Sequence, residues 1–77
     1  MNLEKLLKSL IKNRYKDDLH SAILYFKSGQ TVFVSANYNK SLTVIFRDKD
    51  LSVDCKDVSE VMSLTEIAED ELIDYEI

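Results

Sequence analysis

The chain has 77 residues, with 14 acidic and 10 basic side chains and a formal net charge of −4. A chain of this length forms one domain, residues 1–77, and is too short to build a deep cleft between two walls. Its single cysteine excludes an internal disulfide and a cysteine-based zinc site. No apolar run approaches the roughly 18 residues that span a bilayer, and the lysine-rich N-terminus lacks the apolar core of a signal peptide. We therefore expect a cytoplasmic protein without a membrane partner.

Charge is distributed unevenly along the chain. Residues 1–40 contain seven basic and three acidic side chains, whereas residues 41–77 contain three basic and eleven acidic ones. The two segments therefore carry +4 and −8, which together give the net charge of −4. Such an asymmetry points to an electrostatic partner or to complementarity between copies of the chain.

The N-terminal segment has the apolar spacing of an amphipathic helix. Leucine or isoleucine recurs at i, i+3, i+4, i+7 and i+8, counted from Leu3. Asn2 is placed to cap the helix. The acidic pair at 17–18 opposes the helix dipole, so we expect the helix to end near Tyr15 or Lys16. The solvent side of this helix presents a basic face, which is a second candidate surface: Lys5, Lys8, Lys12 and Lys16.

The hydrophobic period changes to that of β-strands after residue 20. Apolar runs at 22–26, 31–36 and 42–46 predict three strands, and the alternation over 51–55 predicts a fourth. Gly29, the only glycine, lies between the first two runs and predicts a hairpin turn with positive φ. The first three strands are apolar on both faces, and one helix covers only one face. The second face must be covered by curling of the sheet into a barrel, by the C-terminal segment or by another subunit.

The C-terminal segment predicts an acidic amphipathic helix. Residues 57–63 fit either a short fifth strand or the start of a helix. Ser63 and Glu66 match a capping box, and apolar residues then recur on one helical face as far as Tyr75. The expected fold class is α+β: an N-terminal helix, an antiparallel sheet of four or five strands that is either open or bent into a small barrel of the Sm or SH3 kind, and an acidic C-terminal helix.

This order of elements resembles the Sm-like fold, in particular the bacterial Sm-like RNA chaperones. The stretch AILYFKSGQTVFVSANYNKSLTVIF resembles the first three strands of that family, with Gly29 in the turn, and LSVDCKDVSEVMSL resembles the last two. The resemblance covers residues 3–64 and implies a strongly bent five-stranded sheet that assembles through its strand edges. The RNA-binding Lys–His pair of the family is not matched, because Asp57 follows Lys56. Val34 and Ser35 stand where a second glycine is common.

The residue types needed for catalysis or metal binding are sparse. His20 has no second histidine or cysteine nearby, so it fits a surface residue at a strand start better than a metal ligand. Cys55 alternates with apolar neighbours and fits a small core residue better than a catalytic thiol. Neighbouring carboxylates lie in expected turns or on solvated helix faces, where their pKa values stay ordinary. We expect no enzymatic activity, no cofactor and no metal.

Two hypotheses of function follow from the charge pattern. The first is a small acidic protein-binding module, whose carboxylates imitate nucleic acid and occupy a basic surface of a partner protein. In size and charge the chain resembles small inhibitors of host defence from phages and mobile elements, anti-CRISPR proteins included. The second is an Sm-like oligomer that binds RNA or a nucleotide, although the acidic second half opposes phosphate binding. Acidic residues also keep proteins soluble. The residues expected to bind the partner are Glu66, Glu69, Asp70 and Asp74, supported by Asp48, Asp50 and Asp54.

Overall fold

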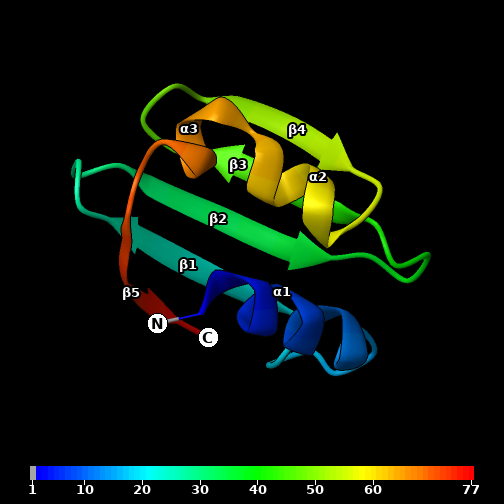
Figure 1. Cartoon of the computed structure of the whole chain (residues 1–77). Helices are drawn as coiled ribbons and strands as arrows, with labels where there is room; N and C mark the ends of the chain where they lie inside the picture. Colours follow the sequence, from blue (N-terminus) through cyan, green and yellow to red (C-terminus); the bar gives the residue numbers. More distant parts are fainter. Residues whose placement is uncertain (1) are drawn as a thin grey trace.

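A computed structural model describes residues 2–77 as a five-stranded antiparallel sheet with helices on one face (Figure 1). The elements in chain order are α1 (Leu3–Lys12), β1 (Ser21–Phe26), β2 (Thr31–Ala36), β3 (Leu42–Phe46), β4 (Leu51–Cys55), α2 (Val58–Ser63), α3 (Thr65–Ala68) and β5 (Leu72–Glu76). The strand order across the sheet is β4-β3-β2-β1-β5. The expected α+β class, with an N-terminal helix and an antiparallel sheet, is confirmed.

Helix α1 forms where the apolar stripe predicts it but is shorter than expected. The side chain of Asn2 accepts a hydrogen bond from the Lys5 backbone N–H at 3.0 Å, which caps the first turn. The helix ends at Lys12 and not near residue 15 or 16, because Asn13 takes the C-cap position and Arg14 folds back. The Arg14 guanidinium donates to the Ile11 carbonyl at 3.0 Å. The helix packs three leucines against the sheet: Leu6, Leu7 and Leu10.

Strands β1, β2 and β3 alternate strictly between a buried inner face and a half-buried outer face. Gly29 has a φ of +97° in the β1–β2 turn, as the sequence predicts. Cys55 is buried on the inner face of β4, which confirms its expected place in the core. Among residues 2–77 no polar or charged side chain is buried, so apolar burial alone decides which face turns inward.

The sheet is open and does not close into a barrel. Strands β4 and β5 lie at opposite edges. Helices α2 and α3 lie on the same face as α1, where they bury Val61 and Ile67 in the common core (Figure 1). The opposite face of the sheet, called the outer face below, has no helix over it. Neither a barrel nor the C-terminal segment covers the second apolar face in the single chain.

The single C-terminal helix expected over residues 63–75 is wrong. Residues 58–63 are helical, with Asp57 as N-cap: its carboxylate accepts from the Glu60 N–H at 2.9 Å. Leu64 is extended, with ψ of 131°, and separates α2 from the one-turn α3. Residues 72–76 then form β5, because the free edge of β1 offers them backbone hydrogen bonds, with Leu24 opposite Tyr75.

Candidate binding surfaces

Six acidic residues gather at one end of the sheet, which we call the acidic end: Asp48, Asp50, Glu66, Glu69, Asp70 and Glu71. Here the β1–β2 turn, the β3–β4 turn and the segment from α3 to β5 lie side by side (Figure 1). Three contacts join these segments. The Lys27 N–H donates to the Glu71 carbonyl at 2.8 Å, Gln30 Nε2 donates to the Glu66 carbonyl at 2.7 Å, and Lys49 Nζ lies 3.1 Å from Glu66 Oε2. The fold therefore unites five of the seven acidic residues singled out by the sequence.

Asp70 holds the acidic end together. Its carboxylate accepts hydrogen bonds from the Ser28 N–H at 3.2 Å, from the Ser28 hydroxyl, and from Gln30 Nε2 at 2.8 Å. The Ser28 hydroxyl, followed by Gln30 and two backbone N–H groups, holds the pKa of Asp70 below its ordinary value of 3.8. Asp70 thus has a structural role that the sequence analysis missed, since residues 28 and 70 are far apart in the chain.

We expect Asp70→Asn to lower the melting temperature by roughly 5 °C at pH 7, because the neutral amide accepts these bonds less well. The pKa of Asp70 is lower in the folded than in the unfolded chain. The stabilisation is therefore present above the unfolded pKa and is lost as the pH falls through the folded pKa. Thermal unfolding by circular dichroism should show the difference between variant and wild type disappearing as the pH falls through the folded-state pKa of Asp70. Glu69→Gln, the same change at the exposed neighbouring residue, is the control.

Asp54 does not belong to this cluster, because it lies opposite Thr43 at the other end of the sheet, so the expected single acidic array is wrong for this residue. Asp54 lies on β4 and Asp74 on β5, at opposite edges of the sheet. Four strand spacings separate these edges, roughly 19 Å in a flat sheet. Asp74 lies opposite Tyr25, near the end of β1 that leads into the β1–β2 turn, so it flanks the acidic end at the β5 edge of the sheet.

The basic face of α1 is solvated and partly neutralised. Lys5, Lys8 and Lys12 are exposed on the helix, whereas Lys16 lies beyond its end. Lys8 Nζ lies 2.8 Å from Glu4 Oε2, and this hydrogen bond lowers the pKa of Glu4. An exposed pair of this kind adds little stability, and it removes one lysine from a continuous basic surface.

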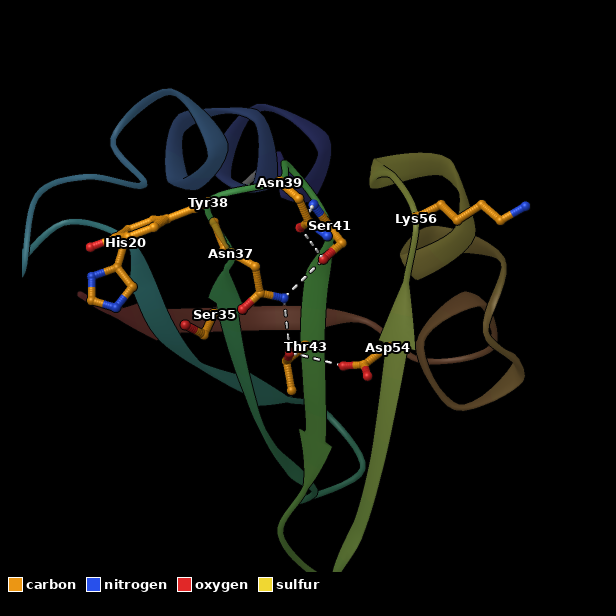
Figure 2. Close-up of a pocket in the computed structure, with 10 residues that line it drawn as sticks. His20, Ser35, Asn37, Tyr38, Asn39, Ser41, Thr43, Asp54 and Lys56 are labelled. Carbon is orange, nitrogen blue, oxygen red and sulfur yellow. Dashed lines mark hydrogen bonds between the residues drawn. The ribbon is translucent and has the colours of Figure 1, made fainter.

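A shallow polar hollow lies on the outer face at the end of the sheet opposite the acidic end, which we call the opposite end (Figure 2). Asn37 Nδ2 donates to Ser41 Oγ at 3.0 Å and to Thr43 Oγ1 at 3.1 Å, and Thr43 Oγ1 donates to Asp54 Oδ1 at 2.9 Å. His20 lines the same hollow, whereas the Lys56 side chain points away from it (Figure 2). The sequence analysis missed this hollow, although the outward positions of the predicted strands signalled it.

Among the hydrogen bonds of residues 2–77, none joins the His20 ring to a hydroxyl or thiol side chain. His20 Nδ1 lies 2.9 Å from the Lys16 carbonyl oxygen, an acceptor, so this nitrogen carries the proton and orients the ring toward the backbone. Cys55 lies on the other face of the sheet, and burial raises the pKa of its thiol, which makes it a poor nucleophile. Within residues 2–77 no group of three or more His, Cys, Asp or Glu side chains is placed to hold a metal ion.

Comparisons with protein families, with curated proteins and with solved structures found no match to this chain. The longest helix, α1, has 10 residues. No helix within residues 2–77 reaches the length and hydropathy that crossing a bilayer requires.

Proposed function

We propose that the protein is a small non-enzymatic binding module whose acidic end binds a basic surface of a partner protein. The observation that supports this is the convergence of three chain segments on one negatively charged end. Its acidic residues outnumber its basic residues, Lys27, Arg47 and Lys49, by two to one. Local electrostatic potential of one sign speeds association with an oppositely charged surface and selects against like-charged partners.

The acidic end has both fixed and free carboxylates, and this division supports a binding role. Asp70 and Glu66 are held by hydrogen bonds and by Lys49, so they fix the geometry of the cluster. Asp48, Asp50 and Glu69 are exposed, and are thus open to a partner's lysines or arginines. We propose that this end competes with nucleic acid for a basic groove, as expected of an inhibitor from a phage or mobile element.

Charge reversal at the free carboxylates tests the proposal. Asp48→Lys combined with Glu69→Lys should abolish capture of basic proteins from a bacterial lysate by the immobilised chain. Asp50 is left unchanged because its φ of +52° favours Asp, Asn or Gly. The matched control, Asp17→Lys combined with Asp18→Lys, changes the net charge equally at the opposite end and should retain capture. Added double-stranded DNA should release the captured proteins from the wild-type chain.

Two results contradict the proposal. Equal capture by the two double variants means that net charge and not the acidic end governs binding. If added DNA does not release the captured proteins, the chain does not bind them through a basic groove that holds nucleic acid.

A second candidate function, an Sm-like oligomer that binds RNA, is favoured by the uncovered outer face and by the N-terminal helix followed by four consecutive strands, although residues 58–63, expected to complete a fifth strand, form α2. Fluorescence anisotropy with a labelled single-stranded RNA at low salt tests it, because phosphate contacts strengthen as salt falls. We expect Lys56→Ala, at the position that retains half of the family's RNA-binding pair, to weaken such binding.

A further inference from the structure

The polar hollow at the opposite end has an exposed aromatic ring at its rim. The side chain of Tyr38 is 70% exposed and lines the hollow together with His20 (Figure 2). Two contacts position it. The ring centroid of Tyr15 lies 5.1 Å from that of Tyr38 with a tilt of 45°, and Arg14 Nε donates to the Tyr38 carbonyl at 3.0 Å. The hollow therefore has a positioned aromatic surface that is open to a ligand.

The rest of the hollow is lined by amide and hydroxyl groups that hydrogen bonds hold in place. Ser41 Oγ donates to Asn39 Oδ1 at 2.6 Å, and the bonds from Asn37 to Ser41 and Thr43 and from Thr43 to Asp54 continue this network. Within residues 2–77, Asn37 Oδ1, Asn39 Nδ2 and Asp54 Oδ2 take part in no hydrogen bond. One donor group and two acceptor atoms on positioned side chains are thus available to a ligand.

Charge and polarity decide which class of ligand suits the hollow. Of the residues within 2–77 that line it, only Asp54 and Lys56 carry a full charge at pH 7, and the Lys56 side chain points away (Figure 2). An anion such as phosphate would meet the Asp54 carboxylate without a facing cation. An apolar ligand would bury the amides and hydroxyls without replacing their bonds to water. These groups are best satisfied by an uncharged ligand whose hydroxyls both donate and accept.

We infer that the hollow binds a neutral carbohydrate, with one pyranose ring stacked on Tyr38. The C–H groups on one face of a pyranose pack on the electron-rich face of an aromatic ring. The hydroxyls around the sugar ring then reach Asn37, Asn39 and Asp54. The hollow is shallow and encloses few ligand atoms, so we expect a dissociation constant in the millimolar range. This site lies at the other end of the sheet from the acidic end and does not depend on the proposed function.

Chemical-shift titration by proton–nitrogen NMR of the isotopically labelled chain tests the inference. The probes are four neutral sugars: methyl β-D-glucopyranoside, methyl β-D-galactopyranoside, methyl α-D-mannopyranoside and N-acetyl-D-glucosamine. Each is added up to about 100 mM, which approaches saturation of a site with a millimolar dissociation constant. At least one sugar should shift the backbone amides of residues 37–43 in a saturable manner and leave those of residues 66–71 unchanged. Failure of all four sugars to shift the amides of residues 37–43 overturns the inference.

Variants of exposed tyrosines separate stacking from unspecific effects of the sugar. Tyr38→Ala should weaken binding at least about tenfold, whereas Tyr38→Phe retains the ring and should retain binding. Tyr75→Ala removes a 39% exposed tyrosine that lies opposite the buried Leu24 on β1, away from the hollow, and should also retain binding. Undiminished binding by Tyr38→Ala overturns the inferred arrangement.

Two charged probes, inorganic phosphate and tetramethylammonium, test the choice of a neutral ligand. Neither should shift the amides of residues 37–43 at the concentration at which a sugar does. If either ion shifts these amides and none of the sugars does, the hollow serves a charged ligand and the inference is wrong.

Discussion

Replacing Leu24 by alanine is expected to lower the free energy of unfolding by about 2–5 kcal/mol, the range for a buried leucine. Leu24 is fully buried at the centre of the core. It lies opposite Val32 on β2 and opposite Tyr75 on β5, so a cavity there weakens both neighbouring strands. A 77-residue domain has a total stability of about 4–12 kcal/mol, so this one substitution removes a large part of it.

Urea denaturation followed by circular dichroism measures the effect of Leu24→Ala. Ile73→Ala is the matched control, because Ile73 is a similar side chain that is 52% exposed on β5. We expect the control to change the free energy of unfolding by less than about 0.5 kcal/mol. Equal effects of the two substitutions would contradict the assignment of Leu24 to the core.

Val61→Asp is expected to prevent the native packing of α2. Val61 is the buried residue of this short helix and is fully enclosed by the core. A carboxylate there has no polar partner, because no polar or charged side chain within residues 2–77 is buried beside it. Burying an unpaired charge costs several kcal/mol, which approaches the stability of the whole domain.

The dispersion of amide signals in a proton–nitrogen NMR spectrum measures this outcome. Val61→Asp should give a collapsed spectrum or a mixture of folded and unfolded signals. Ser63→Asp places the same side chain at an exposed position of the same helix and should keep the dispersed spectrum. A dispersed spectrum for Val61→Asp would mean that α2 does not anchor on the sheet through this residue.

The elements that depend on local pattern could be predicted from the sequence. Strands β2 and β3 agree with the predicted runs at both ends, and β1 begins one residue early. The turn at Gly29 and the cap at Asn2 follow from single residue types whose backbone or side-chain chemistry suits those positions.

The C-terminal segment could not be predicted because its sequence suits two structures. The pair Ser63 and Glu66 has the spacing of a capping box, but the Ser63 hydroxyl donates to the Glu60 carbonyl and caps nothing. The segment LIDYE has apolar residues that fit a helical face as well as a strand. The segment forms a strand and not a helix because it pairs with the open edge of β1. This pairing is a tertiary interaction, which the local sequence pattern does not reveal.

The candidate sites were predictable to different degrees. Residues 48–50 and 66–71 were recognised as acidic, but the expectation of one long helix concealed their proximity to each other. The polar hollow depends on Asn37, Thr43 and Asp54 pointing to the same face, which the strand period predicts once the hairpins are paired. To predict which residues of different elements lie close together, one must know how the strands pair and not only where each strand lies in the sequence.

The open edges of the sheet have a consequence for how the protein behaves at high concentration. The two outermost strands carry Asp54 on β4 and Asp74 and Glu76 on β5, and the pairing of β5 with β1 has an irregularity between Tyr25 and Phe26. Charges and a distorted ladder on edge strands hinder the stacking of chain after chain into fibrils. We therefore expect the two unpaired edge strands not to drive assembly of the protein into fibrils.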